Sequence, residues 1–171
     1  LAGTKMRQHI SAKAVLFGAI FSLVAGCSAP TANQNNDWLK TKECLNCDLT
    51  GANLKGADLT NAKLNGANLT NANLENANLS GAFLDSVNLT GAKLKCAYLS
   101  LAGLSQANLS NADLSNAKLA GAFLRGANLT GANLTDAKFN DADLGSANLE
   151  GAKLEGADFK GAIKPDGSIE K

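Results

Sequence analysis

Four cysteines, Cys27, Cys44, Cys47 and Cys96, carry most of the reactive side-chain chemistry in this 171-residue chain. Cys44 and Cys47 have the C-x-x-C spacing that occurs in disulfides, thiol-redox centres and zinc sites. A redox centre of the thioredoxin kind needs this pair at a helix N-terminus in a βαβ context, which the surrounding sequence lacks. A zinc site would need a second Cys pair or a His pair, and none is present. In an exported protein the favoured interpretation is a Cys44–Cys47 disulfide, with thiol-redox chemistry as a minor alternative.

The rest of the chain contains little that indicates enzyme activity. The only histidine is His9, in a segment interpreted below as a signal peptide, so His-assisted nucleophilic catalysis and His-ligated metals are excluded from the mature protein. General acid–base catalysis needs a sheltered carboxylate with a shifted pKa. The neighbouring Asp141 and Asp143 are interpreted as part of a solvated face. The sequence therefore predicts no catalytic residue, no metal site, no cofactor and no enzyme activity.

The net charge bears on nucleic-acid binding. Residues 28–171 contain 13 basic and 15 acidic residues, a net charge of −2. A nucleic-acid-binding surface would need a basic stripe, which is missing. No nucleic-acid partner is predicted.

The N-terminal segment predicts export. Lys5, Arg7 and Lys13 precede an apolar run over residues 14–25, which is too short to span a membrane but typical of a signal peptide. Leu-Val-Ala-Gly-Cys at 23–27 resembles the bacterial lipobox, which implies removal of residues 1–26 and a lipid on Cys27. The alternative is an ordinary signal peptide with a chance cysteine.

Residues 27–36 are small and polar and are predicted to form a flexible tether between the lipid and the folded part. A lipid anchor binds the membrane stably when it contains more than one acyl chain. The expected location is therefore a bacterial membrane, on its periplasmic or thylakoid-lumenal side.

A five-residue repeat dominates the rest of the chain. An apolar residue, here called position i, recurs from Leu49 to Phe159 at 23 positions, 21 of them Leu and two Phe; Ala stands at i−2 except at Cys47 and Val87. Neither a helix nor a plain strand keeps all these residues on one face. Short extended pieces separated by bends do, and Gly, Asn, Asp and Ser at i+2 suit the bends. Repeated bends predict a solenoid filled with Ala and Leu.

A longer period of 20 residues favours four repeats per coil. The i−1 residues of every fourth repeat are mostly asparagine, which suggests polar side chains stacked from coil to coil. They are Asp48, Asn68, Asn88, Asn108, Asn128 and Asn148.

The A-(D/N)-L-x-x tandem resembles the pentapeptide-repeat proteins over about two-thirds of the chain. The resemblance implies an all-β, right-handed quadrilateral β-helix of nearly six coils. The Cys pair before the first repeat is similar to lumenal members of cyanobacteria and chloroplasts. Some members mimic DNA to protect gyrase, but this role implies a strongly acidic cytoplasmic protein, so it is a minor alternative here.

Both ends of the solenoid need covering. A short helix over residues 38–43, capped by Asn36 or Asp37, is expected within an N-terminal cap at 37–46, with Trp38 and Leu39 as its plug. The β-helix is expected over 47–163 and a C-terminal tail over 164–171. Phe159 and Ile163 mark the far end, where either the tail folds over the last coil or two copies stack as a homodimer.

Outward positions are almost all small or polar, with one mid-chain exception. Phe83, Gly103 and Phe123 occupy one i−1 column, and nearby positions add apolar or charged groups. The predicted interaction patch comprises Phe83, Tyr98, Leu101, Gly103, Phe123 and Arg125. Exposed apolar clusters with polar rims often mark partner surfaces. The alternative is that the two rings simply cover the weak point at Gly103.

Cys96 falls at a corner, where a free, partly exposed thiol capable of intermolecular pairing is expected. Taken together, the sequence predicts a non-catalytic, lipid-anchored scaffold with an unidentified protein partner. The main alternative is a structural or stress-related lumenal or periplasmic protein without a dedicated partner.

Overall fold

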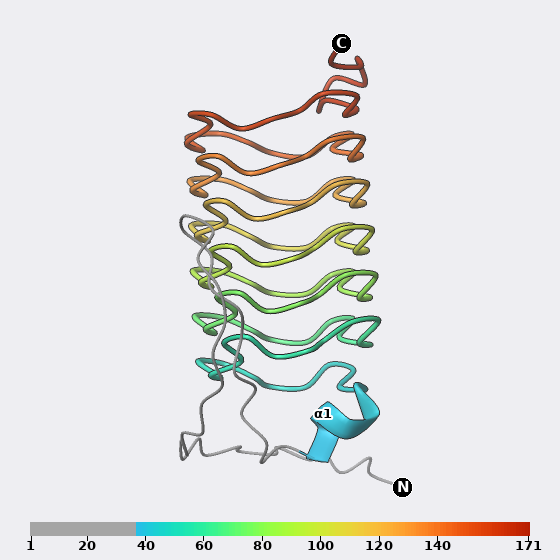
Figure 1. Cartoon of the computed structure of the whole chain (residues 1–171), viewed down its shortest axis with the longest axis vertical. Coiled ribbons are helices and arrows are strands. Elements are labelled where there is room, and N and C mark those ends of the chain that lie inside the picture. The colour runs from blue at the N-terminus through green and yellow to red at the C-terminus, as the bar shows by residue number, and fades with distance from the viewer. Residues whose placement is uncertain (1–36) are drawn as a thin grey trace, which may run out of the picture.

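The computed structural model describes residues 37–171, which form a rod of stacked coils with the C-terminus at the end opposite the helix α1 (Figure 1). Parallel backbone bridges join each i−1 residue to the residue twenty positions later, from Glu43↔Lys63 to Asp143↔Ile163. Four five-residue repeats therefore make one coil, as the column pattern predicts. The predicted signal peptide, the lipidation at Cys27 and the tether lie outside the described residues.

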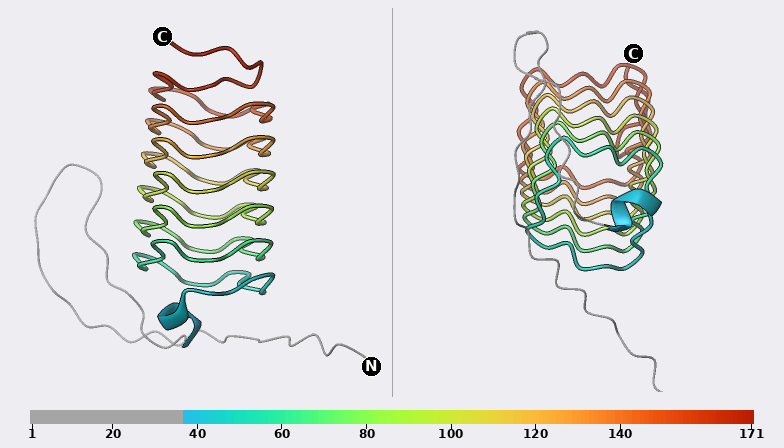
Figure 2. Two further views of the ribbon diagram at one scale, coloured as in Figure 1. Left: turned by 90° about the vertical axis from the view of Figure 1, so that its right-hand side faces the viewer. Right: turned by 60° about the horizontal axis from the view of Figure 1, so that its bottom comes forward.

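The bridges are single residues because the chain turns after each of them. The repeat at Leu49 shows the bonding: its N–H donates to Asn68 O of the next coil at 2.7 Å, and the Ala52 N–H closes the corner on Leu49 O at 3.0 Å. Asn68 N–H in turn donates to Cys47 O at 2.8 Å. The backbone is thus hydrogen-bonded along the rod axis, and Figure 2 shows the coils in register.

Every i+2 residue from Asn46 to Gly161 has a positive φ, between +54° and +76°. This is the left-handed region, which Gly and Asn enter at the lowest cost. The Gly, Asn, Asp and Ser residues at i+2 therefore make the bends that the sequence predicts, and the positive φ angles restore the inward direction of the next Ala and Leu.

The core consists of the Ala and Leu columns. Every i residue from Leu59 to Phe139 is 0% exposed. Each buried Leu contributes about 2 kcal/mol of gross apolar stabilisation. Phe139 stacks on Phe159 of the next coil, with centroids 4.9 Å apart and planes at 8°.

At the N-terminal end, α1 comprises Asp37–Thr41 and lies against one side of the open end of the first coil (Figure 2). It ends two residues before the expected limit because Lys42 adopts a φ of +55°, while its N–H closes the helix on Trp38 O at 2.7 Å. Coil pairing then begins at once, with Glu43 bridged to Lys63. None of the helices within residues 37–171 has the length and apolar character to cross a membrane.

At the C-terminal end, the tail folds back on the chain just before it. Ile169 forms an antiparallel bridge with Ile163, and Glu170 exchanges backbone hydrogen bonds with Gly161 and Ala162. Lys164 pairs with Glu170 at 2.6 Å, and this carboxylate raises the pKa of the lysine. Leu154, on another side of the last coil, stays 42% exposed. The tail therefore covers only part of the end.

Candidate interaction surface

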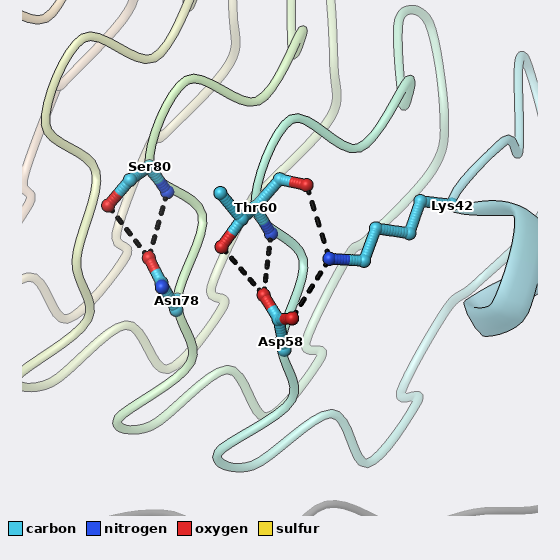
Figure 3. A network of polar contacts seen from close by, with 5 residues as sticks. All are labelled: Lys42, Asp58, Thr60, Asn78 and Ser80. Carbon is cyan, nitrogen blue, oxygen red and sulfur yellow. Dashed lines mark hydrogen bonds and ion pairs between the residues drawn. The ribbon is translucent and has the colours of Figure 1, made fainter.

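The polar sides of the rod are built from one repeated side-chain motif. An Asn or Asp at i−1 accepts hydrogen bonds from the N–H and, where present, the hydroxyl of the residue at i+1. Figure 3 shows two examples: Asn78 Oδ1 accepts from Ser80 N and Oγ at 3.1 and 2.7 Å, and Asp58 Oδ1 accepts from Thr60 N and Oγ1 at 3.1 and 2.6 Å. This motif engages most of the outward Asn and Asp residues at i−1 within the chain.

Apolar side chains interrupt this polar surface in the middle of the rod. Phe83 is 50% exposed, Phe123 52%, Leu101 64% and Tyr98 38%. These are the four apolar outward residues that the repeat register predicts. Three further large apolar residues are exposed near the ends of the described chain: Leu45, Leu154 and Ile169. The repeat register also places Leu45 outward, at i+1 of the Cys44 repeat, although the predicted patch does not include it.

Phe83, Gly103 and Phe123 form a continuous column, here called the Phe column. Gly103 is bridged in parallel to Phe83 on one side and to Phe123 on the other. Gly103 does not require a positive φ, and a Cβ there would lie 3.4 Å from Asp85 Oδ1. A larger residue could therefore adopt this backbone, and its Cβ would be in van der Waals contact with the Asp85 carboxylate.

Leu101 occupies the corner that leads into the Phe column. Its φ is +59°, an unusual conformation for a bulky side chain. A Cβ at Gly121 would lie 2.8 Å from Leu101 Cδ2, so the leucine lies over this glycine. In the same corner column, Asn61 and Asp141 lie over Gly81 and Gly161 in the same way. Leu101 therefore replaces a polar residue better suited to this conformation, and backbone strain of this kind often accompanies function.

Tyr98, on the adjoining side, is engaged within the chain. The ammonium of Lys118, one coil further on, lies 4.4 Å from its ring centroid. Such a cation–π contact partly covers the ring. Tyr98 therefore contributes a smaller free apolar surface than the two phenylalanines.

Charged residues border the Phe column at both ends. Arg125 donates to Asp143 Oδ2 from Nη2 at 2.9 Å, so its guanidinium is directed toward the following coil. The Gly145 N–H and, secondarily, Arg125 hold the pKa of Asp143 below its ordinary value. At the other end, Lys63 Nζ pairs with Glu43 Oε1 at 2.6 Å, one coil before Phe83.

Asp85 lies beside the middle of the column. Its Oδ1 accepts from Ser105 N–H at 3.0 Å, and its Oδ2 accepts from Asn65 Nδ2 at 3.2 Å. No basic residue within the described range 37–171 forms an ion pair with it. This carboxylate is therefore held in place by neutral donors and keeps its charge unbalanced.

The cysteines have different environments. The sulfur atoms of Cys44 and Cys47 are placed as a disulfide, with Cα atoms 5.5 Å apart, within the range a disulfide permits. Cys44 is buried in the first coil. The expectation for Cys96 is wrong: it is only 3% exposed and its sulfur is not a free thiol. This corner is therefore more sheltered than the register alone indicates.

The predicted end residues lie where the repeat register places them. Trp38 and Leu39 of α1 and Phe159 of the last coil are half-buried and pack against the core. Ile163 is half-buried and bridged to Asp143 and Ile169. Within residues 37–171 no group of three or more His, Cys, Asp or Glu side chains could hold a metal ion.

The chain matches a known family. The family Pentapeptide repeats matches in eight copies, over residues 43–66, 67–106, 107–145 and 142–163. Comparison with curated proteins gives no match.

Several solved structures are similar. A pentapeptide repeat protein, Rfr23, from the cyanobacterium Cyanothece 51142 is 34% identical, covers 75% of this chain and 92% of its own, and has a TM-score of 0.45. The Nostoc PCC 7120 protein alr5209 is 39% identical, with coverage of 47% and 66% and a TM-score of 0.46. A protein from the Arabidopsis thaliana thylakoid lumen is 24% identical, with coverage of 82% and 77% and a TM-score of 0.42.

Proposed function

This chain belongs to the pentapeptide-repeat family, a premise from which we propose that it is a non-catalytic scaffold that binds another protein through one side of its rod. One observation carries the proposal: two half-exposed phenylalanines and a strained, exposed leucine gather at mid-rod, on a surface that is otherwise mostly small and polar. These apolar side chains are only partly buried by the chain itself. A partner that covers them would bury the rest of their surface.

Export and a lipid anchor complete the proposal. The basic N-terminal segment, the apolar run at 14–25 and the lipobox-like residues 23–27 support them. Radiolabelled palmitate should be incorporated by the wild type in its native cell and not by Cys27→Ser. Labelling that survives this substitution would contradict the anchor. With this anchor, the scaffold would act at a membrane surface, on the periplasmic or thylakoid-lumenal side.

The N-terminal end is proposed to be a closed cap. Trp38 and Leu39 cover the first coil, and a Cys44–Cys47 disulfide fastens the chain where α1 meets the β-helix. Closing this short loop would contribute about 2 kcal/mol by the chain-entropy relation. Reduction of the purified mature protein should raise the mass of the peptide containing both cysteines by about 2 Da. If the purified mature protein also supports the reduction of insulin, a thiol-redox role replaces the structural one.

A second candidate function is purely structural. Since Gly103 has no side chain, the rings of Phe83 and Phe123 could serve only to shield this part of the sheet. The protein would then need no dedicated partner.

A paired substitution distinguishes the two candidates. Phe83→Ser/Phe123→Ser removes both rings, and Lys93→Ser/Asn133→Ser makes matched changes ten residues further on, on the opposite side of the same coils. Crosslinking with mass spectrometry in the native membrane should show a partner that is lost with the first pair and kept with the second.

The melting temperature separates the remaining outcomes. A scaffold role predicts loss of the partner with little change in melting temperature. A structural role predicts a lower melting temperature and no change in crosslinked proteins. If neither quantity changes, both candidates are wrong.

A further inference from the structure

We propose that the surface at Gly103, between Phe83 and Phe123 and beside Asp85, binds a lysine or arginine side chain of the protein partner. This inference rests on the proposed scaffold function and names the chemistry that the partner presents. A side chain with an apolar stem and a cationic head matches both the rings and the carboxylate.

The spacing suits a single inserted side chain. Adjacent parallel strands lie about 4.8 Å apart, so a group centred over Gly103 is about 5 Å from the column position of each phenylalanine. A cation within about 6 Å of an aromatic ring is attracted to its face. Both rings are half-exposed, and no side chain of Gly103 occupies the space between them.

The charge in this place is unbalanced. A Cβ at Gly103 would lie 3.4 and 3.5 Å from the two carboxylate oxygens of Asp85. Each oxygen accepts one neutral hydrogen bond, and an ionised carboxylate has about four acceptor positions, so capacity remains for a cationic donor. A partner anion would be repelled here, and a purely apolar group would remove water from Asp85 without balancing its charge.

The basic residues that border the Phe column are directed away from it. Lys63 pairs with Glu43, in the coil before its own, and Arg125 pairs with Asp143, in the coil after. Within residues 37–171 no ammonium or guanidinium is recorded over Phe83 or Phe123. The middle of the column therefore presents two rings and a carboxylate that form no ion pair or cation–π contact with a basic residue within 37–171.

In the neighbouring column, a lysine of the chain itself lies over an aromatic ring. Tyr98 and Lys118 are successive i−1 residues, and the lysine ammonium lies 4.4 Å from the tyrosine ring centroid. In the Phe column the residue following Phe83 is Gly103, so no equivalent side chain is available. We infer that a cation from another protein takes this position.

A titration with small probes tests the chemistry directly. N-acetyl-lysine methylamide and its uncharged analogue N-acetyl-norleucine methylamide, which lacks the terminal amino group, are added to the ¹⁵N-labelled full-length mature protein. The lysine probe should shift the Gly103 and Ser105 amide signals, with millimolar affinity, at least threefold more tightly than the norleucine probe. Equal affinities, or no shift at either amide with the lysine probe, would overturn the proposal.

Two variants of the site refine the test. Asp85→Asn removes the charge and keeps the shape, and should weaken lysine-probe binding at least threefold. Gly103→Lys should place the chain's own ammonium between the rings and abolish probe binding, with Gly103→Ala as the control for filling by a methyl group. Fold is checked by circular dichroism, and if Gly103→Lys is misfolded the Asp85→Asn result decides alone. Unchanged probe binding in Asp85→Asn contradicts the inference.

The same variants separate this inference from the scaffold function. If Phe83→Ser/Phe123→Ser loses the crosslinked partner while Asp85→Asn and Gly103→Lys keep it, the scaffold function stands and the cation is wrong. If all of these variants keep the partner, both are wrong. Loss of the partner in all of them supports both.

Discussion

The ammonium of Lys42 lies 3.0 Å from Asp58 Oδ2 and 3.3 Å from the carbonyl oxygen of Thr60 (Figure 3). Lys42 directly follows α1, and Asp58 lies 16 residues later in the first coil. This pair is therefore a polar fastening between the N-terminal cap and the β-helix, in addition to the apolar contacts of Trp38 and Leu39.

Lys42→Met should loosen the cap without unfolding the rod. The variant keeps the apolar stem of the side chain and removes the ammonium, so the expected loss is about 0.5–1 kcal/mol, the scale of a partly exposed ion pair. Trp38 is the only tryptophan in the chain, so its fluorescence reports on this end. In urea the Trp38 transition should move to lower concentration. Lys55→Met, which breaks the Lys55–Glu75 pair within the coils, should leave the Trp38 emission in the absence of denaturant unchanged.

Acid should weaken the same fastening. The hydroxyl hydrogen bond from Thr60, followed by the hydrogen bond from Lys42, lowers the pKa of Asp58 from 3.8 to about 2. Because the folded-state pKa is below the unfolded value, ionised Asp58 stabilises the fold fully above about pH 4 and this stabilisation is lost as the pH falls toward 2.

The free energy of unfolding of the wild type should therefore exceed that of Asp58→Asn at pH 7 by a margin that shrinks between pH 4 and pH 2. NMR titration of the Asp58 carboxyl in Thr60→Val should show a pKa closer to the ordinary value than in Lys42→Met. A margin that stays constant to pH 2 would contradict the assignment.

Replacement of Leu101 should increase the stability of the fold and weaken binding of the partner. Its left-handed conformation costs a bulky residue about 1–2 kcal/mol, whereas asparagine adopts it more easily. Leu101→Asn should therefore raise the free energy of unfolding by about 0.5–1 kcal/mol. The substitution also removes apolar surface beside the Phe column, so partner crosslinking should fall.

Gln106→Asn is the matched control for this prediction. Gln106 has the same φ of +59° and lies over Gly126, at the corner that follows the Phe column, and its replacement by asparagine keeps a polar side chain there. It should give a similar gain in stability with no change in crosslinking. Equal crosslinking in Leu101→Asn and the wild type would remove Leu101 from the interaction surface.

The five-residue register made much of this arrangement predictable. The period alone places Leu59 in the core, Gly103 between Phe83 and Phe123, and Leu101 at the corner beside them, because each position has one direction relative to the coil. Side-chain identity at an outward position then decides whether the surface is polar or apolar. The sequence alone is therefore enough to locate the patch on the rod.

Contacts that depend on side-chain reach were not predictable in this way. The Lys42–Asp58 pair depends on the exact residue at which α1 ends, and the unbalanced charge of Asp85 depends on which neighbours donate to it. The burial of Cys96 was missed for the same reason, since a corner position indicates direction and says nothing of what lies over it.

The C-terminal end should support a weak homodimer. In earlier coils the N–H of each i residue donates to the next coil, as Leu129 does to Asn148 O at 2.8 Å. Within residues 37–171 the equivalent groups of Leu149, Leu154 and Phe159 donate to no backbone carbonyl. Unpaired backbone groups beside a partly exposed leucine form an edge that can pair with a second copy.

Stacking about a two-fold axis would bring the same side chains of both copies together. Leu154→Glu should therefore split the dimer, by juxtaposing like charges and removing apolar contact. Leu45→Glu, an exposed leucine at the other end, is the control and should leave association unchanged.

Sedimentation velocity over a hundredfold concentration range provides the measurement. The wild type and Leu45→Glu should show a concentration-dependent rise toward twice the monomer mass, and Leu154→Glu should stay monomeric. Removal of residues 166–171 should strengthen association, because it uncovers the edge at Gly161 and Ile163 that the tail occupies. A wild type that remains monomeric throughout, with the truncated chain behaving alike, would mean that the open coil end is tolerated in solution without a second copy.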